Sequence, residues 1–224
     1  MCQPEGQDLL QFKTLLIHGA YPQSAPIRVS LSIAQCERAI LISPLRQSLL
    51  RDLGNCDDDW LRSSSGSGVV SKISSRVRIF YPPTPKHVVA LLSLLRCLDS
   101  DNATDVIEPK ATVDPPPCLF ILHEPSAYFL NDQIRCPSTL SSYLLLITHA
   151  RAITEYFSSR RSNPAKSTSL VVFDSGLDQL KLPLFQVPSD PGFDVQEERD
   201  NNPRPEPVLP PAKRCFDIVG TFQG

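Results

Sequence analysis

The chain is expected to fold as an α/β protein, with a mostly parallel sheet and helices on both faces. Short apolar runs alternate with segments whose apolar residues recur at helical spacing, and this alternation is typical of parallel sheets. The clearest run, residues 117–122, follows Pro115 and Pro116 and ends in His123 and Glu124. Ligands bind beyond the carboxyl ends of strands in such sheets, so His123 and Glu124 mark the expected functional edge.

The predicted strands are short, apolar and bounded by turn residues. They are residues 14–19, 39–43, 76–81, 117–122 and 170–174.

The predicted helices show apolar residues on one face. Residues 27–34 fit both periods, since their apolar residues alternate and also recur at helical spacing. The α/β alternation favours a helix there. Thr84 and Pro85 are the expected N-cap and first residue of another helix, and Ser138 is the expected cap of a helix that runs to about Phe157. Residues 45–53 form the remaining predicted helix, and residues 63–68, which are Ser and Gly only, are expected to be a flexible loop.

Composition divides the chain into three parts. It holds 22 Pro and only 9 Gly, with 41% apolar residues, which indicates that part of it does not pack. Residues 1–182 are expected to be the α/β domain. Residues 183–213 combine many prolines with charged residues and are expected to be disordered. Residues 214–224 can supply a last strand of the same domain.

Charge and cysteine content limit the partners and the cellular compartment that are expected. The net charge of −2 provides no overall basic field, so nucleic acid would need a local patch. The 7 cysteines are odd in number, widely spaced and free of C-x-x-C pairs, which favours reduced thiols in an intracellular protein. We see no secretory signal at the start and no apolar run long enough to span a bilayer. The scattered histidines lack metal-ligand spacing, so no zinc site is expected.

Several short motifs resemble one family. Residues 77–84 are Val-Arg-Ile-Phe-Tyr-Pro-Pro-Thr, a leucine-rich helix follows, and Tyr128 lies shortly after the run 117–122. Residues 45–49, Leu-Arg-Gln-Ser-Leu, are similar as well. Over residues 12–180 the chain resembles the RecA-like recombinase paralogue that partners a SWIM-domain protein in Shu complexes.

The resemblance implies a RecA-like P-loop NTPase fold, a nuclear location and a role in homologous recombination and DNA repair. It implies protein–protein interaction with a SWIM-domain protein and a recombinase, and DNA binding to single strands. No membrane contact is expected.

The phosphate loop that this resemblance implies is degenerate. Such a loop follows G-x-x-x-x-G-K-[ST], in which the glycines, the Lys and the hydroxyl bind phosphates and Mg²⁺. Counting from Gly19, the second glycine is Ser24, the Lys is Ala25 and the hydroxyl position is Pro26. Pro22 and Pro26 also remove backbone donors.

The acidic residue expected at the end of the strand 117–122 is also missing. Its position holds His123, and Glu124 follows; neighbouring strand residues point to opposite faces, so Glu124 is no automatic substitute. We therefore expect no ATP hydrolysis, no catalytic residue and no required cofactor, although residual ATP binding is compatible with the sequence.

A basic loop contains Arg160, Arg161 and Lys166 and is the best candidate for contacts with DNA phosphates. An ordinary solvated loop has the same composition.

The expected function is a non-catalytic recombination accessory protein. One alternative is a RecA-like accessory subunit of an Elongator-type assembly for tRNA modification, and another is a divergent NTPase that uses Glu124.

Overall fold

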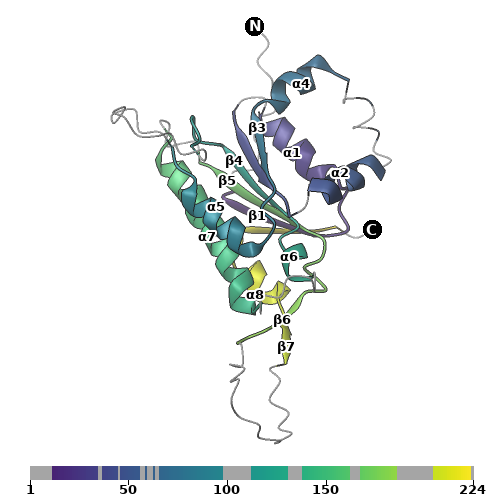
Figure 1. Cartoon of the computed structure of the whole chain (residues 1–224), viewed down its shortest axis with the longest axis vertical. Helices are drawn as coiled ribbons and strands as arrows, with labels where there is room; N and C mark the ends of the chain where they lie inside the picture. Colours follow the sequence, from purple (N-terminus) through teal and green to yellow (C-terminus); the bar gives the residue numbers. More distant parts are fainter. Residues whose placement is uncertain are drawn as a thin grey trace, which may run out of the picture.

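A computed structural model describes residues 12–34, 37–44, 46–55, 59, 63, 66–97, 112–130, 138–161, 167–185 and 204–222. Its centre is a six-stranded sheet flanked by helices (Figure 1). The predicted α/β class is therefore confirmed.

All neighbouring strands of this sheet are parallel. Their order is β3-β2-β4-β5-β1-β8. The strands are β1 (Thr14–Gly19), β2 (Ala39–Ile42), β3 (Val77–Phe80), β4 (Leu119–His123), β5 (Ser169–Asp174) and β8 (Ile218–Phe222). Because they are parallel, their carboxyl ends share one edge of the sheet, which we call the carboxyl edge.

Helices cover both faces of the sheet (Figure 1). One face carries α1 (Ala25–Ala34), α2 (Arg46–Asn55) and α4 (Gly68–Ser74), and the other carries α5 (Pro85–Leu94), α7 (Leu140–Ser159) and α8 (Leu209–Lys213). The short α6 (Ala127–Leu130) follows β4. The ambiguous segment 27–34 is helical, as the α/β alternation predicted. The helix α4 was not predicted, and it begins where the Ser/Gly loop was expected to end.

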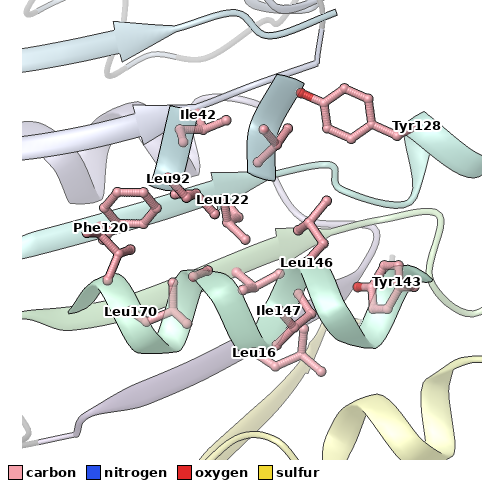
Figure 2. Close-up of a cluster of buried hydrophobic side chains, with 14 of the residues drawn as sticks. Leu16, Ile42, Leu92, Phe120, Leu122, Tyr128, Tyr143, Leu146, Ile147 and Leu170 are labelled. Atoms are coloured by element: carbon pink, nitrogen blue, oxygen red, sulfur yellow. The ribbon is translucent and has the colours of Figure 1, made fainter. Parts of the chain in front are cut away.

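Two apolar cores lie on the two faces of the sheet. The larger core packs β4 residues Phe120 and Leu122 with Leu146 and Ile147 of α7 (Figure 2). The smaller core contains Ile121 and other strand residues against the α1 side. Consecutive β4 residues enter opposite cores because strand side chains alternate, and all of β4 is buried.

The helix caps follow the predicted chemistry. The Thr84 hydroxyl accepts the His87 N–H at 3.3 Å, and Pro85 is the first residue of α5, as predicted. The cap of α7 is Thr139 rather than Ser138, since Thr139 Oγ1 accepts the Ser142 N–H at 3.2 Å.

The proline-rich region contains more structure than the sequence predicted. Residues 186–203 lie outside the described part of the chain, but β6 (Lys181–Pro183) and β7 (Pro205–Pro207) form an antiparallel ribbon that projects from the domain (Figure 1). The prediction of disorder up to residue 213 is therefore wrong for residues 205–213. They order because Val208 and Ala212 are fully buried in the larger core.

Candidate functional site

A group of polar side chains gathers at the carboxyl edge of β1, β4 and β5. We call it the edge cluster, and it consists of Tyr21, Glu124, Ser126, Tyr143 and Asp174. Its members come from two loops, one helix and one strand, so the fold rather than the local sequence brings them together. This is the edge where α/β proteins bind ligands.

The loop after β1 joins this strand directly to α1, in the place where a phosphate loop was expected. It closes on its own backbone: Tyr21 N donates to Gly19 O at 3.0 Å, and Ala25 N donates to Pro22 O at 2.8 Å. Ser24 is fully buried, and Pro26 is buried within α1.

Gly19 is required by its surroundings. Its φ of +91° favours glycine, and a Cβ atom there would overlap the Phe222 carbonyl oxygen of the neighbouring strand β8. We expect Gly19→Ala to reduce the free energy of unfolding by at least about 2 kcal/mol, from backbone strain and displacement of β8. Urea titration would measure the loss. Gly54→Ala is the matched control, because a Cβ atom at Gly54 meets nothing within 4 Å; an equal effect of the two changes would contradict the prediction.

Tyr21 fills the space between the ends of β4 and β5. Its ring is buried and lies edge-on to Phe173 at 5.2 Å and to His123 at 6.4 Å between ring centroids. Its hydroxyl donates a hydrogen bond to Glu124 Oε1. Burial, reinforced by the charge of Glu124, raises the pKa of Tyr21, so the hydroxyl remains a donor.

Glu124 lies just past the end of β4, with a φ of 51°. The expectation from strand alternation therefore does not apply to it, since the strand ends at His123. Its carboxylate accepts the Ser175 N–H, with N–O distances of 3.1 and 3.2 Å, in addition to the Tyr21 hydroxyl. His123 is buried and places Nδ1 3.0 Å from Ser43 Oγ at the end of β2.

Asp174 is the most deeply buried acid of the cluster, and it was not among the predicted site residues. Its carboxylate accepts the Ser126 N–H at 3.1 Å, the Ser126 hydroxyl, and the Tyr143 hydroxyl at 3.0 Å. Burial, followed by the negative charge of Glu124, raises the pKa of Asp174 to about 7, although these hydrogen bonds oppose the shift. Its position at the end of a buried strand, parallel to the strand that ends at His123, is the signal that could have identified it.

A second polar group joins β1 to β8 at the same edge. The buried His18 places Nδ1 3.1 Å from Asp178 Oδ1 and Nε2 2.9 Å from Thr221 Oγ1. Sequence reasoning missed this group as well, because Thr221 lies 203 positions from His18.

The basic loop predicted to contact DNA lies at the amino-terminal end of the parallel strands, where β5 begins and opposite the carboxyl edge. The Arg160 guanidinium lies over the Tyr156 ring, 5.5 Å from its centroid. Arg161 forms an ion pair with Glu37 and donates to Pro116 O at 3.4 Å. Lys166 lies outside the described residues. Arg161 also lines a polar cavity of about 430 Å³ at this end of the strands.

Two further features are absent from the described residues. These residues contain no group of three or more His, Cys, Asp or Glu side chains able to hold a metal ion. Nor do they contain a helix with the length and apolar character needed to cross a bilayer.

The fold and the edge cluster define an α/β protein with an all-parallel central sheet whose acids at the carboxyl edge bond to the protein's own donors. Neither a protein-family model nor a curated protein matches the chain.

Proposed function

We propose that this chain is a non-catalytic accessory protein of homologous recombination and DNA repair. In this role it scaffolds a SWIM-domain partner and a recombinase on single-stranded DNA in the nucleus. The proposal combines the sequence resemblance over residues 12–180 with the geometry of the loop between β1 and α1.

The observation that carries the non-catalytic part is the hydrogen bond from the Tyr21 hydroxyl to Glu124. A nucleotide-hydrolysing loop needs free backbone donors, a lysine and a hydroxyl facing the phosphates. Here the buried Tyr21 ring fills the edge, and Ala25 and Pro26 bring neither a lysine nor a hydroxyl.

The hydrogen bonds of Glu124 also support a non-catalytic role. A catalytic base must reach the proton that it abstracts, but this carboxylate accepts hydrogen bonds from Tyr21 and from the Ser175 backbone. These bonds join the loop after β1 to the ends of β4 and β5. The edge thus serves to hold the fold together, and the protein acts through binding energy.

Affinity purification of the tagged full-length protein from nuclei tests this proposal, with the co-purifying proteins identified by mass spectrometry. We expect a SWIM-domain protein together with a recombinase. Recovery of Elongator subunits in their place would overturn the recombination role and leave the fold unaffected. ATP turnover that is lost in Glu124→Gln would overturn the non-catalytic assignment.

The basic loop provides a separate prediction about DNA. We expect the double change Arg160→Ala/Lys166→Ala to weaken single-stranded DNA binding and to reduce the salt slope by about 0.7 for each lost phosphate contact. Fluorescence anisotropy over a range of salt concentrations would measure both quantities. Arg161 is kept, because its removal would break the ion pair with Glu37.

The matched control for the DNA experiment is Arg46→Ala/Lys86→Ala. It removes the same charge from exposed positions on α2 and α5. Equal losses for the two double variants would contradict a specific contact at the basic loop.

A further inference from the structure

The two outer strands of the sheet differ in how they are protected from association. β3 carries Arg78, directly follows Arg76 and is soon followed by Pro82 and Pro83. Charged side chains and prolines are the usual means of preventing an edge strand from pairing with another chain.

β8, at the other edge, has neither kind of protection within the strand, and Asp217, which directly precedes it, is hydrogen-bonded to Thr14 of β1. Its sequence is Ile-Val-Gly-Thr-Phe, and its apolar side chains Ile218, Val219 and Phe222 are 40%, 36% and 46% exposed. Within the described residues it pairs only with β1, because it is the last strand of the sheet. An apolar edge strand with open backbone groups is suited to accept a further strand.

We propose that β8 pairs antiparallel with β8 of a second copy of this chain. The two sheets then form one continuous sheet across a two-fold axis. This interface is independent of the proposed recombination role, since it rests on the edge strand alone.

The β8 sequence complements itself when the axis passes through Gly220. In that register Ile218 lies opposite Phe222 of the other copy, and Val219 lies opposite Thr221. Pairs of an aromatic and a β-branched residue stabilise antiparallel strands, and a two-fold interface requires each contact to occur twice.

The lack of charged residues in β8 and the small size of Gly220 also favour pairing with a second copy. β8 has no charged residue, so the pairing places no like charges opposite each other. Among the described residues of a single copy, a Cβ atom at position 220 would meet only Leu16 O, at 3.9 Å, and this contact does not require a glycine. At the axis, the glycine leaves room for the Phe222 rings on the same face of the strands, an arrangement used to stabilise glycines in sheets.

The size of the contact sets the expected affinity. A five-residue strand with three exposed apolar side chains is smaller than the ~1,200–2,000 Å² interfaces of stable complexes. The dimer is therefore expected to dissociate on dilution, with a dissociation constant on the order of micromolar.

Sedimentation velocity of the full chain over a range from about 1 to 100 μM tests the proposal. We expect a concentration-dependent dimer, with Val219→Lys raising the dissociation constant by at least about tenfold. Ile79→Lys is the matched control, because Ile79 is 37% exposed on the opposite edge strand, β3. Circular dichroism checks that both variants fold.

Disulfide cross-linking of introduced cysteines tests the register of the two β8 strands without depending on a destabilising change. In a Cys215→Ser background, Gly220→Cys should form a disulfide between copies, because residues at the axis approach within disulfide range. Val219→Cys should form it far less readily, since the two 219 positions are offset by two residues and lie diagonally about 7–8 Å apart, at or beyond disulfide range. A monomer at every concentration, a dimer insensitive to Val219→Lys, or equal cross-linking at both positions would overturn the proposal.

Discussion

Replacing Asp174 with Asn should remove a pH dependence from the stability of this protein. Between about pH 4 and pH 8, the unfolding free energy of the wild type is expected to fall by about 4 kcal/mol relative to Asp174→Asn. The expectation follows from the burial of the Asp174 carboxyl beside Glu124, which raises its pKa from 3.8 to about 7.

The sign follows from proton uptake. Between these two pKa values the folded protein holds a proton on Asp174 that the unfolded chain has released. Stability due to this group is therefore fully present below pH 3.8 and is lost as the pH rises through about 7. The asparagine variant has no proton to lose, so the corresponding slope disappears.

Urea unfolding at a series of pH values would measure this effect. Asp217→Asn is the control, because the pKa of Asp217 is lowered, chiefly by hydrogen bonding to Thr14. That group gives stability that is lost only as the pH falls below the usual range of a carboxyl. A wild type and an Asp174→Asn variant with parallel pH profiles above pH 4 would show that Asp174 is ionised in the folded state.

The second large effect is expected in the core. Phe120→Ala should reduce the free energy of unfolding by about 3–5 kcal/mol, the range for removal of a buried aromatic side chain. Phe120 is 0% exposed and lies in the larger core between the sheet and α7 (Figure 2). As β4 lies between β2 and β5, little room exists for its neighbours to fill the space.

Leu94→Ala is the matched control for this measurement. Leu94 is an apolar residue of α5 with 62% exposure, so its replacement should change stability by less than about 0.5 kcal/mol. If Phe120→Ala lowered the free energy of unfolding no more than Leu94→Ala in the same urea titrations, the result would contradict the packing of Phe120 between the sheet and α7.

Local sequence patterns were sufficient to predict the strands of the central sheet. Buried parallel strands contain nearly continuous apolar runs, and β4 and β5 show such runs at residues 119–122 and 170–173. The N-cap at Thr84 was equally predictable, because a hydroxyl followed by Pro85 meets the needs of a helix start within four residues.

The candidate site was only partly predictable. Position alone placed Gly19, His123 and Glu124 at the carboxyl edge, since each follows or ends an apolar run. The partner of Glu124 was not predictable, because Tyr21 lies 103 positions away in the sequence. Asp174 likewise gains its raised pKa from burial and from Glu124, and neither is a property of the strand that carries it.

By itself, the sequence determined the α/β class, most of the strands and helices, and the absence of a phosphate-loop pattern after Gly19. These depend on residue types and short spacings. The tertiary structure alone decided the strand order, the edge cluster and the burial of Val208 and Ala212 in a proline-rich region. The physical reason is that burial and electrostatic interaction arise from contacts between residues far apart in the chain, and local patterns carry no record of those contacts.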